Sequence, residues 1–164
     1  MAQTSLMPEF ASEMRSTRRL LERLPPDRLA WRPHPKSFTA GGLAGHLVDC
    51  VRWVEAIVAH DTFDIDPATY QPCQATSVPA LLAAFDDRVR RATGLLSEAA
   101  PSVAEVTWRL TVRGVPRVER PKGEALRDFT LHHVIHHRGQ LSVYLRLLDV
   151  PVPGVYGPTA DDAR

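Results

Sequence analysis

The stretch TLHHVIHHRGQL, residues 130–141, holds four of the chain's seven histidines. It lies within a segment, from about residue 124 to residue 148, whose apolar residues recur at helical spacing. Residues four apart share one face of a helix, so two pairs of histidines compete for the inner face. One pair is His132 with His136, and the other is His133 with His137.

The apolar side chains of this segment indicate which pair faces inward. When residues are placed at about 100° intervals around the helix axis, the apolar direction lies close to the bisector of His133 and His137. Arg138 and most other charged residues of the segment fall on the opposite side. We therefore expect His133 and His137 to face the core of the protein, with His132 and His136 on a flank.

Three further segments carry the same periodicity, and they span about residues 6–24, 39–60 and 79–99. Thr39 and Ser77 are suited to cap the second and third of them. The connections are long and rich in turn residues, and the alternation around Arg113-Gly114 predicts a short β-hairpin between the third and fourth helices. The expected fold class is all-α: a four-helix bundle with long crossover connections, forming a single domain over residues 1–164.

The composition argues against several classes of partner. Apolar residues make up 44% of the chain and charged residues 24%, as in soluble globular proteins. The 20 basic and 19 acidic residues form no basic stripe, so we expect neither nucleic acid nor a membrane as partner. No apolar run approaches the roughly 18 residues that cross a membrane, and the N-terminus lacks a signal-peptide pattern. With only two cysteines, the simplest expectation is a cytoplasmic protein with reduced thiols.

A third histidine, His46, lies on the apolar face of the second predicted helix. A buried imidazole without a partner costs about 1–3 kcal/mol, so inward histidines need a ligand or a hydrogen bond. One interpretation is that His46, His133 and His137 are core histidines bonded to carbonyls or a buried water. The other is that they bind one divalent cation, because three protein ligands with an open position are typical of a catalytic zinc-type site.

Cys50 follows His46 by one helical turn, and it either packs as a small buried thiol or ligates the same metal. His34 and His60 lie near helix ends among polar residues, so we expect both to be exposed. Asp49 and Glu55 are candidates to hydrogen-bond the second nitrogen of a metal-binding histidine.

These residues resemble the DinB/YfiT-like superfamily over nearly the whole chain. The resemblance is carried by GGLAGHLVD (residues 41–49), by the entry LPPDRLAWRPHPKSFTAGGLAGHL (residues 24–47), and by LHHVIHHRGQLSVYLRLLDVPVPGVYGP (residues 131–158). Its most specific part is the pattern HxxxHRGQ followed by the Pro-Val-Pro and Tyr-Gly-Pro tail. The resemblance implies a four-helix bundle of up-down-down-up topology and a homodimer.

The resemblance also implies a divalent metal, most commonly nickel or zinc, with iron or manganese as further candidates. Its three histidine ligands match His46, His133 and His137, in agreement with the apolar phase of the helices. Characterised members include S-transferases that use low-molecular-weight thiols, which implies a metal that activates a thiol or water toward a small-molecule substrate. Arg138 and Gln140 then either orient ligands or substrate, or contact solvent or a second subunit. The competing hypothesis is a non-catalytic, metal-stabilised dimeric module that serves in a stress response or in binding.

Overall fold

The computed structural model describes residues 6–162 of the chain, and four long helices dominate it. They are α1 (Leu6–Leu21), α2 (Ala40–Val58), α3 (Val78–Glu98) and α5 (His133–Leu147). α5 continues without a break from the short α4 (Lys122–Leu126) through η3, a π-helical segment at Arg127–His132. Single 3₁₀ turns, η1 at Pro26–Arg28 and η2 at Pro101–Glu105, lie in two of the connections.

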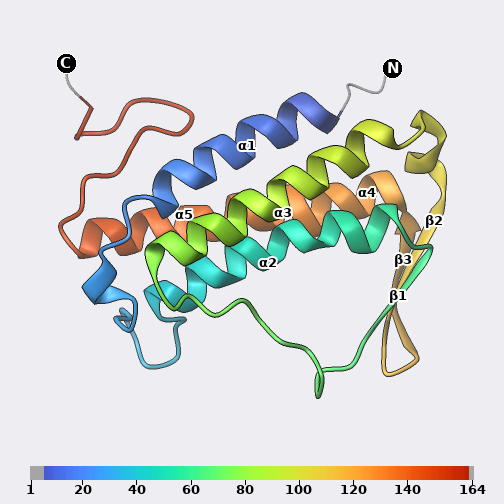
Figure 1. The fold of residues 1–164 in the computed structure, drawn as a ribbon, viewed down its shortest axis with the longest axis horizontal. Coiled ribbons are helices and arrows are strands. Elements are labelled where there is room, and N and C mark those ends of the chain that lie inside the picture. Colours follow the sequence, from blue (N-terminus) through green and yellow to red (C-terminus); the bar gives the residue numbers. More distant parts are fainter. Residues whose placement is uncertain (1–5, 163–164) are drawn as a thin grey trace.

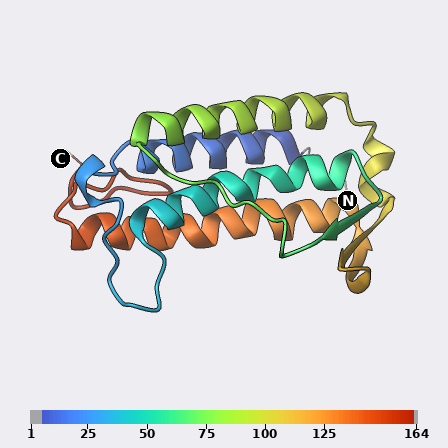
Figure 2. The same ribbon diagram turned by 60° about the horizontal axis from the view of Figure 1, so that its bottom comes forward.

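The four long helices lie side by side along the longest axis of the molecule (Figures 1 and 2). α1 and α2 each pack against both α3 and α5, and the fully buried leucines of all four helices form the core. α2 and α3 begin at one end of the molecule, whereas α1 and the α4–α5 helix begin at the other (Figure 1). None of the helices within residues 6–162 is both long and apolar enough to cross a membrane.

The predicted helix starts are confirmed at two N-caps. The side chain of Thr39 accepts a hydrogen bond from Gly42 N at 3.0 Å, and that of Ser77 accepts one from Ala80 N at 3.2 Å. Each cap satisfies an amide that the first turn of a helix leaves unpaired. α1 ends at Leu21, three residues before the predicted end, just ahead of the two prolines that cannot continue a helix.

The expectation of an all-α fold is corrected by a three-stranded sheet at the end where α2 and α3 finish (Figure 1). β2 (Thr107–Val112) and β3 (Val115–Pro121) form the predicted hairpin, and both turn residues, Arg113 and Gly114, have positive φ angles of 50° and 74°. β1 (Thr62–Ile65) pairs in parallel with β2. β1 was predicted as part of a polar connection, because four residues give too little alternation and their partner strand is distant in sequence.

The crossover from β1 to α3 runs along α2 (Figure 1) and is anchored to it at Cys73. The amide of Cys73 donates to Asp49 Oδ2 at 2.8 Å. One turn earlier on α2, a Cβ at Gly45 would lie only 2.3 Å from the carbonyl oxygen of Cys73. The absence of a side chain at Gly45 therefore lets the two backbones approach closely.

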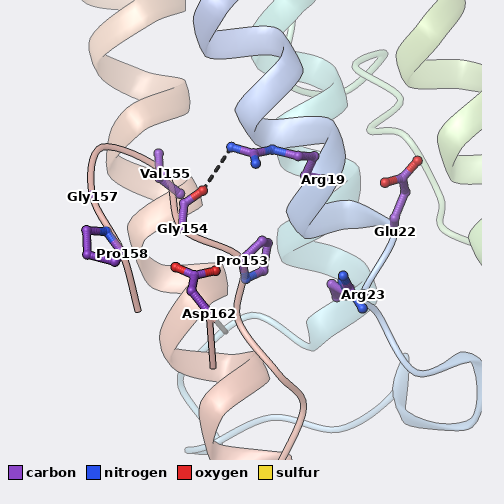
Figure 3. A pocket seen from close by; sticks show the side chains of 9 residues that line it. All are labelled: Arg19, Glu22, Arg23, Pro153, Gly154, Val155, Gly157, Pro158 and Asp162. Atoms are coloured by element: carbon purple, nitrogen blue, oxygen red, sulfur yellow. Dashed lines mark hydrogen bonds between the residues drawn. The ribbon is translucent and has the colours of Figure 1, made fainter. Parts of the chain in front are cut away.

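The chain after α5 folds back toward the end of α1, where Arg19 donates to the carbonyl of Gly154 at 2.8 Å (Figure 3). Asp161 pairs with Arg146 and accepts a bond from Val152 N at 2.9 Å, so the tail is tied to α5 as well. A cavity of about 640 Å³ between tail and α1 is lined by charges of both signs and by no histidine or cysteine. The histidines and the cysteine that the sequence singled out therefore lie elsewhere.

Candidate metal centre

Three histidines from two helices lie ring to ring where α2 packs against α5. The ring centroids are 5.0 Å apart for His46 and His133, 4.5 Å for His46 and His137, and 4.8 Å for His133 and His137. All three side chains are half-buried. The structure thus brings together the three residues that the sequence singled out, at the edge of the core rather than within it.

Two of these imidazoles point nitrogen atoms at each other. His46 Nε2 and His133 Nε2 are 3.2 Å apart. His133 also forms a hydrogen bond with the backbone of Phe129, one turn earlier in the π-helical segment. Since a neutral imidazole has one donor and one acceptor, a bond donated to a carbonyl leaves the other nitrogen of His133 as a lone pair directed at His46.

Gln140 holds the ring of His137. Its Oε1 lies 2.7 Å from His137 Nδ1, and its Nε2 lies 3.0 Å from His136 Nε2. Because an amide oxygen only accepts, the proton of neutral His137 resides on Nδ1 and its Nε2 keeps a lone pair. The sequence left open whether Gln140 belongs to the site or to the surface. In the structure it orients His137, a member of the histidine cluster.

The surroundings favour the neutral form of all three imidazoles. Burial, followed by the neighbouring imidazoles, lowers the pKa of His133 to about 4. Burial also lowers the pKa values of His46 and His137; His137 opposes the charged form of His46, and the Gln140 contact partly offsets the lowering at His137. Neutral imidazole is the form that binds a metal ion, so at neutral pH the three histidines are in the protonation state that metal binding requires.

Cys50 offers a further donor beneath the cluster. The ligand atoms of His46, Cys50 and His133 all lie within 4.8 Å of one another. The Cys50 side chain is fully buried, and burial, with the charge of Asp49 as the second cause, raises the pKa of its thiol to about 12. Cys50 thus both packs in the core and lies close to two of the three histidines.

Phe38, in the connection before α2, covers the cluster from the solvent side. Its ring stacks on His46 with centroids 5.5 Å apart and meets His137 edge-on at 6.4 Å. The hydroxyl of Tyr144 donates to the carbonyl of Phe38 at 3.2 Å, which ties this connection to α5. Phe38 was not among the predicted site residues. Its only signal in the sequence is that an aromatic residue stands just ahead of the helix cap Thr39.

Arg138 is buried, which corrects the prediction that it lies on the solvent side of the last helix. Its side chain is 3% exposed and pairs with Glu13 of α1 at 2.7 Å. Its guanidinium also donates to the hydroxyl of Tyr156, which in turn donates to Glu13. Arg138 therefore joins α5, α1 and the tail, and it does not orient the histidines.

The remaining sequence candidates fall outside the cluster. Asp49 is buried but binds the amide of Cys73 rather than an imidazole, and Glu55 is exposed. The prediction that His34 and His60 are exposed is confirmed, and His132 and His136, which were predicted on a flank of the helix, are also exposed.

Comparisons with known proteins agree with this architecture. The chain is 26% identical over 155 residues to the uncharacterized protein YrdA of Bacillus subtilis strain 168, covering 94% of this chain and 86% of that protein. A DinB-like protein from Bacillus cereus ATCC 10987 superposes with a TM-score of 0.74 at 21% identity, covering 92% of this chain and 95% of that one.

The DinB-like protein YjoA of Bacillus subtilis superposes with a TM-score of 0.69 at 16% identity, covering 90% of this chain and 96% of that one. At these identities the two solved structures establish the fold alone. The sequence model of the DinB family matches residues 1–164, the full length of the chain. The chain therefore belongs to the DinB family.

Proposed function

We propose that this chain is a metal-dependent enzyme whose four long helices form the up-down-down-up bundle of its family, with His46, His133 and His137 as ligands of one divalent cation. The observation that carries the proposal is the ring-to-ring convergence of three neutral imidazoles from two helices. A bound cation would supply Lewis-acid chemistry, lowering the pKa of a thiol or water so that its anion forms near neutral pH.

The spacing of two of the proposed donors fits a cation. Two nitrogens at about 2.0–2.1 Å from a tetrahedral zinc ion lie roughly 3.3 Å from each other. The Nε2 atoms of His46 and His133 are 3.2 Å apart, which places them at the edge length of such a tetrahedron. Imidazole suits nickel, zinc and iron, so nickel or zinc is the proposed metal, with iron or manganese as the alternatives.

The chain's own residues have distinct tasks in this proposal. Gln140 fixes the tautomer of His137, and the backbone of Phe129 fixes that of His133. Phe38 restricts the access of water to the cluster from the side on which it stacks. Together they hold the donors in position before the cation arrives, which reduces the reorganisation that binding requires.

Cys50 supports the second candidate function, a non-catalytic module. A thiolate from Cys50 beside the histidines would complete the coordination with protein ligands, as in structural zinc sites, and leave no position for a substrate. In that case the metal would stabilise a dimeric binding or stress-response protein. The two candidates differ in one measurable respect, which is whether sulfur from the protein binds the metal.

The shared premise is tested by metal content. Protein purified without chelator should contain one equivalent of nickel, zinc, iron or manganese, and His133→Ala should lose it. His132→Ala is the matched control, because His132 is the adjacent, exposed histidine that pairs with Asp128. Wild-type protein that stays metal-free after incubation with each of these metals would overturn both candidates.

The two candidates are separated with cobalt. Cobalt(II) bound through sulfur gives a strong near-ultraviolet charge-transfer band, whereas cobalt bound through imidazoles alone does not. The enzyme proposal expects no such band in wild type, and an added low-molecular-weight thiol should create it. A band in wild type that Cys50→Ser removes, together with no thiol conjugation to an electrophile above the metal-free control, would favour the module.

A further inference from the structure

A second cavity, separate from the histidines, lies where α2, β1 and α3 meet. Its volume is about 360 Å³, within the range of roughly 300–1,000 Å³ that small-molecule sites occupy. Its walls include Arg52 and Trp53 of α2, Phe63 of β1, Tyr70 of the crossover and Arg88 of α3. None of the three clustered histidines lines it, so a ligand here would not need the metal.

Arg88 brings to this cavity a guanidinium that is unpaired within residues 6–162. Its side chain is half-buried, and none of the residues that the structure describes forms a hydrogen bond or ion pair with it. Arg52, which also lines the cavity, lies over the ring of Tyr70 at 5.7 Å, makes a long contact of 3.4 Å to the carbonyl of Gln71, and lies 3.6 Å from Asp49 Oδ1. Two guanidinium groups with free donors therefore face the same space.

The acidic groups in and beside the cavity balance its arginines in number, but they leave Arg88 without an ion pair to any described residue. Asp49 is 5% exposed; its Oδ2 binds the amide of Cys73 and its Oδ1 lies 3.6 Å from Arg52. Arg91, a third arginine of the lining, pairs with Asp87 at 2.9 Å. Glu55 is exposed at the rim and opposes an anion from there. Among the described residues Arg88 has no acidic partner, so its guanidinium is the group of the cavity that an anionic ligand would contact.

The aromatic residues that line the cavity, Trp53, Phe63 and Tyr70, favour a ligand with a flat apolar group. Trp53 meets Phe63 edge-on with centroids 6.0 Å apart, and the ring of Tyr70 lies beneath the guanidinium of Arg52 at 5.7 Å. Flat apolar groups pack well against such rings, and a carboxylate matches the fork of donors that a guanidinium presents. We propose that this cavity binds a small aromatic carboxylate, with the carboxylate on Arg88 and Arg52 and the ring against Trp53 and Phe63.

The test uses benzoate as the probe, with benzamide as its neutral match and acetate as its match without a ring. Binding to chelator-treated protein is measured by calorimetry and by the indole NMR signal of Trp53, assigned with Trp53→Phe. Benzoate should bind and shift this signal, whereas benzamide and acetate should bind at least tenfold more weakly. Equal binding of benzoate and benzamide, or no benzoate binding at millimolar concentration, would overturn the proposal.

Substitutions in the cavity lining test whether benzoate binds there. Arg88→Gln should weaken benzoate at least tenfold, while Glu55→Gln should strengthen it because it removes a nearby negative charge. Arg90→Gln is the matched control, since Arg90 lies on the same helix with its side chain 74% exposed and outside the cavity lining. The melting temperatures of the variants should equal that of wild type. Unchanged benzoate affinity in both Arg88→Gln and Glu55→Gln would assign the probe to another site.

Discussion

Gln140 determines which nitrogen of His137 is available to a metal ion. Its Oε1 accepts from Nδ1 at 2.7 Å, so Nε2 keeps the lone pair. We predict that Gln140→Leu lowers metal affinity about 10- to 100-fold, the usual effect of removing a hydrogen-bond partner of a metal-binding histidine. Competition against a chromogenic chelator measures this affinity.

Two variants make the Gln140 result specific. Gln140→Glu keeps an acceptor oxygen and should retain most of the affinity. Ser142→Ala, two residues further along the same helix, removes only a bond from its hydroxyl to the carbonyl of Gly139 and should change nothing. If Gln140→Leu binds metal as tightly as Ser142→Ala does, the orienting role is wrong.

Arg138 illustrates a buried charge whose loss is costly. The side chain of Arg138 is 3% exposed and that of Glu13 is 10% exposed. Removing one partner therefore leaves the charge of the other buried without a counter-charge. Arg138→Met should therefore lower the free energy of unfolding by about 3–5 kcal/mol, measured by urea denaturation. The exposed pair of Arg90 and Asp87 offers the contrast, because Arg90→Met should have little effect.

A double substitution checks the cause of that loss. Glu13→Leu combined with Arg138→Met removes both charges, so the double variant should be more stable than either single variant. Additive losses would mean that packing, rather than the stranded charge, dominates.

At this scale the sequence predicted which three histidines lie together but misplaced Arg138. Arg138 lies on the same helical row as Leu141 and Leu145, which are fully buried. An arginine is assigned to solvent by default, since a charged group is seldom buried without a partner. Its partner Glu13 is 125 residues away, and no local pattern links the two.

At the scale of the element, the π-helical segment before α5 was beyond sequence analysis. A uniform helix of about 100° per residue was assumed over the whole segment, whereas Arg127–His132 adopts wider turns. The phase before this segment therefore shifts relative to the phase after it. His133 and His137 both follow this segment, so their shared face was predicted correctly. Phe129 lies within it, so its contact with His133 was not predicted.

α2 depends on a glycine where the crossover touches it. A Cβ at Gly45 would lie 2.3 Å from the carbonyl oxygen of Cys73, so Gly45→Ala must displace the crossover and weaken the bond from Cys73 to Asp49. We expect a loss of about 1–3 kcal/mol in the free energy of unfolding, the cost of leaving a buried polar group unpaired. Chemical denaturation measures it.

Gly94 of α3 is the matched control for Gly45. It also lies within a helix, but a Cβ there would meet nothing within 4 Å. Gly94→Ala should therefore stabilise the protein by about 0.5–1 kcal/mol through helix propensity. The close approach at Gly45 would be refuted by a Gly45→Ala variant that is stabilised to the same extent.

At the scale of the whole molecule, strand pairing between neighbouring segments could be predicted from the sequence, whereas strand pairing between distant segments could not. The hairpin of β2 and β3 was predicted from the alternation around Arg113-Gly114, because its two strands are adjacent in sequence. The parallel pairing of β1 with β2 joins Thr62 to Arg109 across α3, so only the folded chain reveals it. Trp108 fixes this sheet to α2 through a bond from its indole nitrogen to the carbonyl of Ala56 at 3.1 Å.

The stability of the whole metal-free protein should fall as the histidine cluster gains protons. The folded pKa of His133 is about 4, and those of His46 and His137 are also lowered, against an ordinary value of 6.5 in the unfolded chain. Between about pH 6.5 and 4 the unfolded chain therefore binds more protons, so stability decreases as the pH falls through this range. For half-buried His133 we expect a loss of about 1–3 kcal/mol after solvent screening.

Urea denaturation in the presence of a chelator, at intervals from pH 7 to pH 4.5, measures this dependence. Carboxylates such as Asp161 and Glu119 affect only the acidic end of this range, because their pKa values are lowered from 3.8 and 4.5 and the unfolded groups gain protons near those values. His133→Gln should flatten the profile, since glutamine does not titrate, whereas the exposed His34→Gln should leave it unchanged. A profile that is equally steep in His133→Gln and wild type would show that the cluster is not the source of the pH dependence.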